Sequence, residues 1–454
     1  MAYNVYIAKV KNIRPAENAD RLNLCEVFGN TTVVDKSVNE NDLYVYLPVD
    51  GQISEEYGKE NDLFRRKDEN GNAAGGFIDP KTRRIVAIKL RGNKSDGLVM
   101  PLVSLEPFGD TSGLCEGDVV TVFNGHEIAC KYIPVKRVAD SGKAGNRTRK
   151  KKVPVAPLFA EHADTEQLVY NLADFRPGDQ IELTLKMHGT SQRTGYLPVL
   201  KGYKRTLLDR ILRRDGTPIY DWGYVTGTRR TVLDNYEGGF YGSNEFREQH
   251  SKTFEGKLYQ GETVYYEVTS YTTDGTPIMG IANVPKEAQQ EYGKTMVFHY
   301  GCEPTGKKML YGIDEMGDQF GIEEDAPQSD MYVYRMTLTT KEGYTIEYTP
   351  DYMRYRCEQI GAKTVPVFWR GYIPKEIDDA GEWVKNKAEE FYDGPDPIGK
   401  THVREGVVIR VVNKPKFVAY KHKNFLFKQI TGIISEKLSI ENTKDIPDDI
   451  LSEF

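Results

Sequence analysis

A strand-like run that ends in a lysine and a glycine turn constrains this chain more than any other feature. Between Ile181 and Lys186 apolar and polar residues alternate, which predicts a half-buried β-strand. The apolar face carries Ile181, Leu183 and Leu185, and the polar face carries Glu182, Thr184 and Lys186. Lys186 is therefore expected to point into a polar cleft.

The loop after this strand reads Met187-His188-Gly189-Thr190-Ser191. Gly189 permits a tight turn and lets backbone N–H groups approach a phosphate. A lysine amine beside such a loop can attack phosphorus and form a phosphoramidate, so the pattern is typical of covalent nucleotide transfer. The same pattern also fits a lysine next to an ordinary hairpin turn. Companion residues elsewhere in the chain have to decide between the two interpretations.

Four later strand-like segments carry side chains that suit a nucleotide site. They are Val264–Val268, Tyr332–Met336, Glu405–Arg410 and Ala419–Asn424, which hold Glu267, Tyr334, Glu405, and the pair Lys421 and Lys423. An aromatic ring can stack on a purine, and a carboxylate can hold a hydrated metal ion. The two lysines share one strand face and can bind phosphate oxygens together. Each residue alone also fits a solvated side chain, but five segments in this order favour a site.

The series Lys186-x-His188-Gly189, Glu267, Tyr334, Glu405-Gly406 and Lys421-x-Lys423 resembles motifs I, III, IIIa, IV and V of the covalent nucleotidyltransferases. Within that group, which includes DNA ligases and mRNA capping enzymes, it is most similar to the RNA ligases. The phrases Phe159-x-x-His162-x-Asp164-Thr165 and His402–Val408 are also similar to theirs. The resemblance covers about residues 155 to 435. Leu185 departs from it, because many relatives carry Glu directly before the lysine.

This resemblance implies an ATP-dependent RNA ligase that joins 3′-hydroxyl and 5′-phosphate ends through lysyl-AMP and RNA-adenylate intermediates. Lys186 would be the nucleophile, and Lys421 and Lys423 would bind phosphates and favour its neutral form. Glu267 and Glu405 would organise the sugar and a hydrated Mg²⁺ or Mn²⁺ ion, and Tyr334 would stack on adenine. The remaining nucleotide contacts would come from Leu185, Met187, His188, Gly189, and Arg193 or Arg229.

The amino-terminal part carries a second resemblance. Ala19-Asp20-Arg21-Leu22, Leu43–Tyr46 and Ile88–Leu98 resemble the OB-fold domain that precedes the ligase domain in Deinococcus-type RNA ligases. Short β-rich runs separated by Gly, Asn and Asp turns agree with a small barrel: Val5–Val10, Thr31–Val34, Leu43–Leu47, Ile85–Leu90 and Val119–Phe123. DNA ligases and capping enzymes instead carry this domain after motif V.

We therefore expect an α+β protein with three parts. Residues 1–133 would form an OB-like β-barrel, residues 134–154 a basic linker, and residues 155–454 a nucleotidyltransferase domain of antiparallel sheets flanked by helices. The linker stretch 136–152 holds eight basic residues against one Asp, and it could track a phosphate backbone or be a plain solvated linker.

Two further segments need an interpretation. Lys201–Arg214 has apolar residues at helical spacing among basic ones, which predicts a basic amphipathic helix that contacts RNA or docks on the core. Gly394–Thr401 matches the P-loop expression, but a predicted helix at Glu382–Phe391 precedes it and the predicted strand Glu405–Val412 follows it. Because a P-loop sits between a strand and a helix, in that order, we interpret this segment as an ordinary loop.

Composition narrows the remaining classes. The net charge of −6 and the mean hydropathy of −0.56 fit a soluble enzyme, and no apolar run reaches membrane length. Five scattered cysteines without Cys-x-x-Cys spacing favour neither a disulfide framework nor a zinc site.

We expect a monomer in the cytoplasm, or in the host cytoplasm for a viral protein, acting in RNA repair on a nicked duplex or a broken tRNA. The alternatives are a DNA ligase, a guanylyltransferase, and a non-catalytic OB-fold RNA-binding protein.

Overall fold

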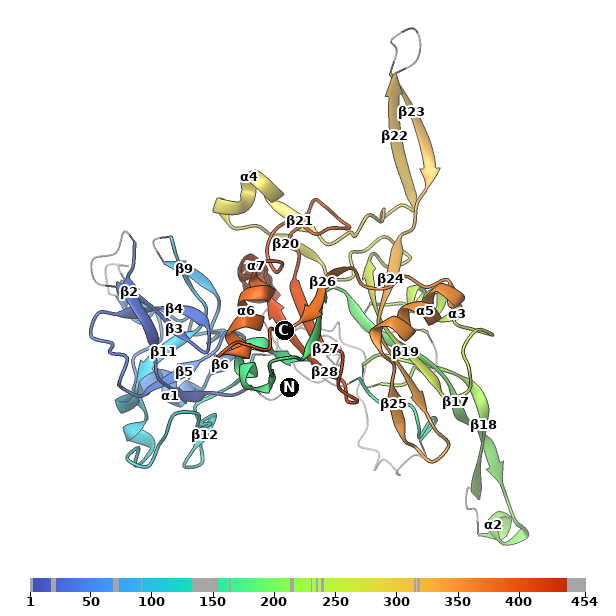
Figure 1. The fold of residues 1–454 in the computed structure, drawn as a ribbon, viewed down its shortest axis with the longest axis horizontal. Helices are drawn as coiled ribbons and strands as arrows, with labels where there is room; N and C mark the ends of the chain where they lie inside the picture. The colour runs from blue at the N-terminus through green and yellow to red at the C-terminus, as the bar shows by residue number, and fades with distance from the viewer. Residues whose placement is uncertain are drawn as a thin grey trace.

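The computed structural model shows a small β-rich domain at the amino terminus and a larger region built around two sheets (Figure 1). It describes residues 3–17, 22–67, 73–90, 92–132, 154–162, 165–212, 216–229, 231–233, 236–237, 241–313, 316 and 319–438. The basic linker stretch 136–152 lies outside the described residues. In the part of the chain that the structure covers, no helix has the length and apolar character needed to span a membrane.

The amino-terminal domain consists of short strands and one short helix. In chain order these are β1 (Tyr6–Ala8), β2 (Lys11–Pro15), β3 (Leu22–Val27), β4 (Asn30–Asp35), β5 (Tyr44–Leu47), β6 (Gly51–Ile53), α1 (Glu55–Glu60), β7 (Arg66–Lys67), β8 (Ala73–Gly75), β9 (Ile88–Leu90), β10 (Asn93–Ser95), β11 (Leu98–Pro101), the 3₁₀ helix η1 (Leu102–Phe108), β12 (Val122–Phe123), β13 (His126–Glu127) and β14 (Ala129–Lys131). The strands form small antiparallel sheets, the largest being β1-β5-β11 and β2-β3-β4.

These sheets enclose an apolar core, as alternating strands with one buried face should. Ile7, Val45 and Leu47 are fully buried in it. Three expected strands differ from the structure. In Ile85–Leu90 only Ile88–Leu90 form a strand, β9. The run Val5–Val10 contributes only β1, and the chain starts a second strand at Lys11. In Val119–Phe123 only Val122 and Phe123 form a strand, while Val119 makes an isolated bridge to Tyr6.

The larger region contains two five-stranded sheets. The first sheet has the order β15 (Glu166–Gln167), β28 (Val418–Lys423), β27 (Gly406–Val411), β16 (Gln180–Leu185) and β26 (Val367–Tyr372). The second sheet has the order β18 (Thr217–Gly227), β17 (Thr190–Lys204), β19 (Glu262–Ser270), β24 (Ser329–Thr339) and β25 (Thr345–Glu347). Neighbouring strands are antiparallel throughout except for β15 and β28.

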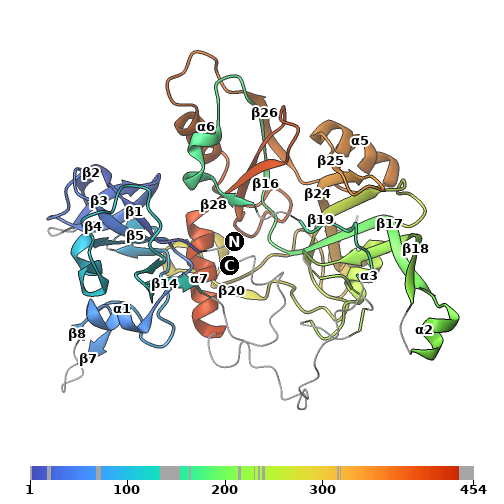
Figure 2. The same cartoon turned by 90° about the horizontal axis from the view of Figure 1, so that it is seen from below.

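Helices cover the apolar faces of both sheets (Figure 2). α3 (Glu245–Lys252) and α5 (Pro350–Ile360) pack on the second sheet, and α6 (Ala380–Glu389) packs on the first. α7 (Phe425–Leu438) contributes Phe427 and Ile430 to a third core that also holds Leu185 and Met187. The remaining elements are η2 (Leu168–Tyr170), η3 (Leu172–Asp174), α2 (Leu207–Ile211), β20 (Ile281–Asn283), η4 (Lys286–Ala288), α4 (Gln289–Tyr292), β21 (Thr295–Val297), β22 (Lys307–Ile313) and β23 (Gln319–Asp325).

The predicted strand before Lys186 is β16, and its alternation is confirmed. Ile181, Leu183 and Leu185 are at most 1% exposed and belong to apolar cores. The predicted helix at Glu382–Phe391 is also present, two residues earlier in the chain, as α6. It begins after Asp379, whose side chain accepts a hydrogen bond from the backbone of Glu382 and so caps the helix. The segment Gly394–Thr401 is a loop between α6 and β27, as predicted.

The prediction of one amphipathic helix over Lys201–Arg214 is wrong in extent. Lys201 to Lys204 continue strand β17, because they pair with β18, and the helix α2 spans only Leu207–Ile211. The helix does not dock on the core. Leu207, Leu208 and Ile211 are 68 to 79% exposed, at the outer end of the β17–β18 hairpin (Figure 1).

Candidate active site

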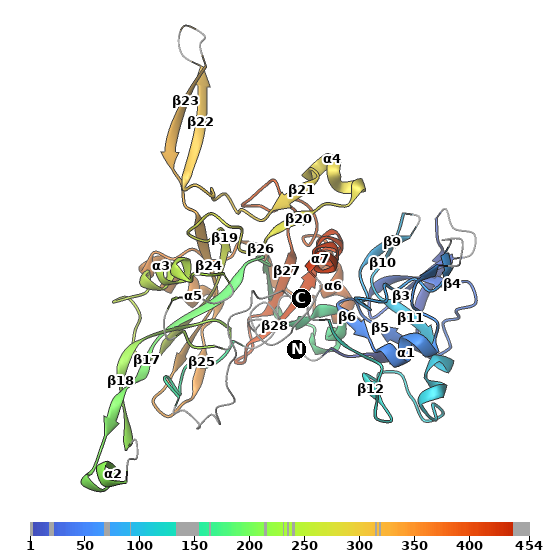
Figure 3. The same ribbon diagram turned by 180° about the vertical axis from the view of Figure 1, so that it is seen from behind.

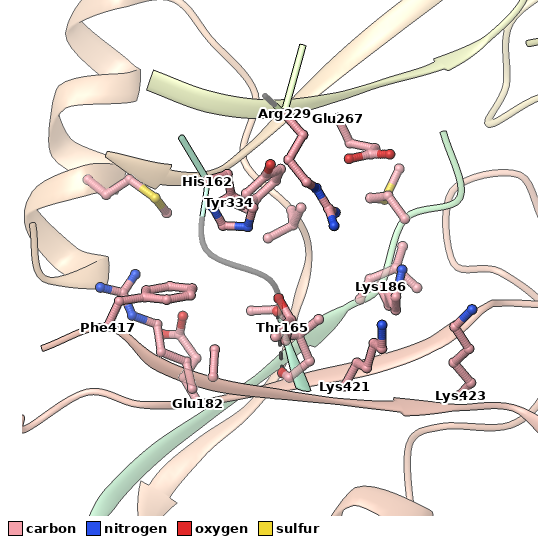
Figure 4. Close-up of a pocket in the computed structure, with 18 of the residues that line it drawn as sticks. His162, Thr165, Glu182, Lys186, Arg229, Glu267, Tyr334, Phe417, Lys421 and Lys423 are labelled. Atoms are coloured by element: carbon pink, nitrogen blue, oxygen red, sulfur yellow. Dashed lines mark hydrogen bonds between the residues drawn. The ribbon is translucent and has the colours of Figure 1, made fainter. Parts of the chain in front are cut away.

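A cavity of about 100 Å³ lies between the two five-stranded sheets (Figure 4). The first sheet supplies residues from β16, β27 and β28 and from the loop after β16, and the second sheet supplies Glu267 from β19 and Tyr334 from β24. Lys186, Lys421 and Lys423 line what we call its cationic end, and His162, Tyr334 and Phe417 line its aromatic end. The structure thus brings together five segments that are far apart in the sequence.

Lys186 directly follows β16, and strand pairing fixes its position. Its backbone N–H donates to the carbonyl of Gly406 at 3.0 Å, and Leu185 pairs in register with Val407 of β27. The side chain is 19% exposed, and its Nζ lies 2.8 Å from Oε1 of Glu405. The predicted nucleophile therefore reaches the cavity from a rigid element rather than from a mobile loop.

Glu405 is the electrostatic centre of the cationic end. Its side chain is 1% exposed, and besides Lys186 it has Lys423 at 3.4 Å. Burial alone would raise the pKa of Glu405, but Lys186 and Lys423 outweigh burial and hold that pKa far below its usual range. The carboxylate is therefore ionised at neutral pH.

Lys421 and Lys423 extend from the same face of β28, two residues apart, as predicted. Lys421 pairs in register with Val408, and Lys423 with Gly406, which places Lys423 beside Glu405. Burial, and then the charges of Lys423 and Lys186, place the pKa of Lys421 well below its usual value. A phosphate group would favour the charged form of Lys421 by supplying the missing negative charge.

His188 and Gly189 shape the loop after Lys186. The His188 ring is packed edge-on between Phe298 and Phe427, at 4.6 and 4.7 Å between centroids, and its backbone N–H donates to the Tyr300 hydroxyl at 2.7 Å. Burial lowers the pKa of His188. At Gly189 a Cβ atom would lie 2.4 Å from the carbonyl oxygen of Val268, so only glycine lets the loop pass this close to β19.

Three predicted residues on or next to strands of the second sheet border the same cavity. Glu267 and Tyr334 come from adjacent strands, and Arg229 follows β18 (Figure 4). The Tyr334 hydroxyl makes a hydrogen bond of 2.9 Å with the hydroxyl of Ser191, which anchors the tip of the ring at the aromatic end. Leu185 and Met187 also line the cavity, although both side chains are mainly part of the apolar core beneath it.

Four of the predicted site residues, His188, Gly189, Arg193 and Glu405, do not line the cavity, and Arg193 points away from it into the interior. Its side chain is buried, with the guanidinium stacked over Phe159 at 4.3 Å. It donates to the carbonyl oxygens of Ala160 at 3.0 Å and of Arg229 at 2.6 Å. The structure thus gives Arg193 a positioning role, since it holds the backbone from which Arg229 enters the cavity.

Sequence reasoning missed a charged pair in the wall of the cavity. Glu182 of β16 accepts two hydrogen bonds from Arg354 of α5, at 3.0 and 2.8 Å, and its side chain is 3% exposed. The alternation already placed Glu182 on the face of Lys186, so its presence in the wall was predictable. Arg354 was not, because nothing in the sequence pairs it with a residue 172 positions away. Phe417, which precedes β28, was missed for the same reason.

The carboxylates fit a divalent cation of the magnesium type. Oε2 of Glu405 is buried without a hydrogen-bond partner, and it lies 3.6 Å from Nδ1 of His188. Glu267 lines the same cavity. Within the described residues, no cluster of three or more His, Cys, Asp or Glu side chains is arranged to hold a metal ion. Mg²⁺ commonly uses one or two protein carboxylates together with water and substrate phosphates, which this donor set can provide.

A second cavity, of about 320 Å³, lies between the amino-terminal domain and the first sheet, and Lys421 and Lys423 line it too. The two domains make contact around it. Tyr6 stacks on Tyr170 with 5.3 Å between ring centroids, and Lys428 of α7 forms an ion pair with Asp96. The amino-terminal domain therefore lies against the cationic end of the site.

Comparisons with known proteins agree with this architecture. A family model described as an OB-fold domain matches residues 4–102. Among solved structures, Naegleria gruberi RNA ligase with PPi is 17% identical, with a TM-score of 0.55, covering 95% of this chain and 98% of that chain. A mutant of that ligase with AMP and Mn is 16% identical, with a TM-score of 0.54 and the same coverage. No curated protein matches this chain. The expected fold is confirmed: the chain has the fold of these RNA ligases, with its OB-fold domain at the amino terminus.

Proposed function

We propose that this protein is an ATP-dependent RNA ligase that seals 3′-hydroxyl and 5′-phosphate ends. One observation carries the proposal. Lys186, Glu405, Lys421 and Lys423 form a single buried cluster at one end of a cavity whose other end is aromatic. A nucleoside triphosphate has the matching polarity, with a flat base at one end and a chain of negative charges at the other.

The first step would be attack of Lys186 on the α-phosphate of ATP. Nζ forms a bond to phosphorus, the bond to the bridging oxygen breaks, and pyrophosphate leaves while Nζ gives up its protons. Lys421 and Lys423 bind phosphate oxygens and offset the charge that develops on the leaving group. Tyr334, held by Ser191, supports the base and keeps the α-phosphate aligned with the amine.

Two further transfers would complete sealing. A 5′-phosphate oxygen of RNA attacks the phosphorus of lysyl-AMP, and the bond to Nζ breaks to give an adenylated RNA end. The 3′-hydroxyl of the other strand then attacks that RNA 5′-phosphate, and AMP leaves. Arg229, which enters the cavity beside Glu267, is placed to hold the AMP or the RNA phosphate during both transfers (Figure 4).

Glu405 positions the nucleophile. Before substrate binds, it holds the Lys186 amine at 2.8 Å and balances part of the positive charge of the cluster. Mg²⁺ or Mn²⁺, held by Glu405 and Glu267, would supply charge neutralisation and orientation at the phosphates when bound. Attack requires the lone pair of Nζ to be free, and the 2.8 Å contact with Glu405 holds the amine at the cationic end where the phosphates would bind.

Support for an RNA substrate comes from the domain order rather than from the cavity. The likeness to RNA ligases and the amino-terminal OB-fold domain favour RNA ends, in a nicked duplex or a broken tRNA, over DNA nicks or mRNA caps. A DNA ligase or a guanylyltransferase remains the second candidate for the same cluster. A non-catalytic RNA-binding protein would leave the lysine cluster without a use.

The test is covalent labelling. The full-length protein is incubated with Mg²⁺ and ATP labelled at the α-phosphate, and the label is followed on a denaturing gel and on nicked RNA duplexes. We expect a labelled protein with wild-type Lys186, none with Lys186→Met, and an unchanged signal with Lys36→Met, a change at an exposed lysine far from the cavity. Label from GTP would support a guanylyltransferase. Absence of any adduct from a folded wild-type protein would refute nucleotidyl transfer.

A further inference from the structure

A two-stranded hairpin, β22–β23, projects from the body of the molecule (Figure 1, Figure 3). Both of its faces carry exposed apolar side chains. Tyr311 and Ile313 share one face and are 81% and 69% exposed, while Leu310 pairs with Ile322 on the other. A two-stranded ribbon is only marginally stable by itself in water, and contiguous exposed apolar surface marks an interaction site. The ribbon is therefore built to pack against a partner.

The charge of this hairpin disfavours nucleic acid as that partner. By sequence, residues 307–325 contain two basic side chains, Lys307 and Lys308, against six acidic ones: Asp314, Glu315, Asp318, Glu323, Glu324 and Asp325. The first three of the acidic residues lie outside the described residues. A phosphate backbone would be repelled by this surplus of negative charge. The matching surface has to be apolar and basic.

The outer end of the β17–β18 hairpin is such a surface. Leu207, Leu208 and Ile211 of α2 are 68 to 79% exposed there. Residues 201–215 contain six basic side chains against two acidic ones, and Lys201 and Lys204 are exposed on β17. The two projections thus have matching apolar character and opposite charge.

One molecule cannot join its own two projections. The β22–β23 hairpin and α2 lie at opposite ends of the second sheet and point in opposite directions, as the views in Figure 1 and Figure 3 both show. We propose that the β22–β23 hairpin of one copy docks on the α2 end of the β17–β18 hairpin of a second copy. The sequence alone led us to expect a monomer.

This contact is heterologous, because each copy uses two different surfaces. Successive copies would add head to tail and give an open chain, or a ring if the rotation closes. RNA is the competing occupant of the α2 end, since its basic side chains also suit phosphates. Three large apolar side chains in water contribute nothing to a phosphate contact, which is why the observations favour a protein surface.

Sedimentation velocity on the full-length protein over a range of concentrations tests the proposal. The hairpin variant is Tyr311→Ser with Ile313→Ser, and the α2 variant is Leu208→Ser with Ile211→Ser; all four side chains are exposed, so the fold should persist. The matched control is Ile281→Ser, which removes a side chain that is 58% exposed outside both projections. Adenylylation of each variant by labelled ATP checks that the active site is intact.

We expect the wild type and the control to associate as concentration rises, less so at high salt because the surfaces have opposite charge. Each variant alone should lose association. An equimolar mixture of the two variants should give a dimer and nothing larger, because each copy keeps one complementary surface. A monomeric wild type at every concentration would overturn the proposal. The proposal would also be overturned if the hairpin variant lost association while the α2 variant still associated. The same holds if the α2 variant lost RNA affinity while its association stayed unchanged.

Discussion

Glu405 and Lys186 form a largely buried ion pair of 2.8 Å at the cationic end of the cavity. Replacing Glu405 with Gln leaves the cations Lys186 and Lys423 without their counter-charge. We expect Glu405→Gln to cost about 3 kcal/mol of unfolding free energy at pH 7, the usual loss when one partner of a buried pair is removed. Adenylylation should fall on the order of 100-fold or more. Urea unfolding and labelling with ATP measure the two effects.

The stability effect should depend on pH with a definite sign. Because the pKa of Glu405 is lowered in the folded protein, its contribution is complete above the ordinary glutamate value of about 4.3 and is lost as pH falls through the folded value. The difference between wild type and Glu405→Gln should therefore be full at pH 7 and shrink below about pH 4. An equally large difference at pH 7 and pH 3 would contradict this account.

Lys421 should take up a proton when ATP binds. Its pKa is well below the usual value in the free protein, through burial first and then through Lys423 and Lys186, and phosphate oxygens would raise it again. ATP affinity should then decrease as pH rises through the lowered value. Titration calorimetry in buffers of different ionisation enthalpy measures the proton uptake, which Lys421→Met should abolish. Uptake that persists in Lys421→Met would assign the proton to another group.

Two substitutions at Tyr334 separate the contribution of ring stacking from that of the hydroxyl hydrogen bond. Tyr334→Leu removes the ring, and we expect it to weaken ATP binding by about 1–3 kcal/mol, the range measured for base–aromatic stacks. Tyr334→Phe keeps the ring and loses only the 2.9 Å bond to Ser191, so its cost should be about 1 kcal/mol. Ser191→Ala is the matched control and should behave like Tyr334→Phe. Equal effects of Leu and Phe would show that the ring does not contact the base.

The Glu182–Arg354 pair calls for a double-mutant cycle. Arg354→Met leaves the Glu182 carboxylate buried, with Arg370 as its remaining partner at 3.8 Å, and should lower the unfolding free energy by about 3 kcal/mol. Adding Glu182→Gln removes the stranded charge and should recover much of that loss. Thermal and urea unfolding of both single variants and the double variant give the coupling. Strict additivity would mean that the pair makes no net contribution to folding.

The sequence was most informative where a strand carried its own signal. Lys186, Glu267, Tyr334, Lys421 and Lys423 all line one cavity, and Glu405 pairs with two of these lysines. Each stands in a short alternating or buried-strand pattern. Period-two alternation fixes the face of a side chain without any knowledge of the partner strand. This is why the polar face of β16 could be assigned before its neighbours were known.

Other features depend on contacts that no local pattern records. The guanidinium of Arg193 would suit a phosphate ligand, yet it donates hydrogen bonds to the carbonyl oxygens of Ala160 and Arg229, which hold it in the interior. In Lys201–Arg214 the apolar spacing indicated one helix, but pairing with β18 extends the strand to Lys204. Pairing between β17 and β18 outweighs the local helical preference there. The hydrogen bonds between the two strands depend on the register of β18, which the local sequence of β17 does not record.

The register of β27 against β28 limits which sequence changes such a protein can tolerate during evolution. Gly406 faces Lys423, and Val408 faces Lys421, so a slip of one residue would turn both lysines to the opposite face. Substitutions of side chains and insertions in the loops between strands leave this register unchanged. A single residue inserted inside β27 or β28 would shift the register and turn the lysines away from the site. Selection is therefore expected to act on strand length far more strictly than on residue identity. A shared architecture across 95% of the chain at 17% identity is what such a constraint would leave behind.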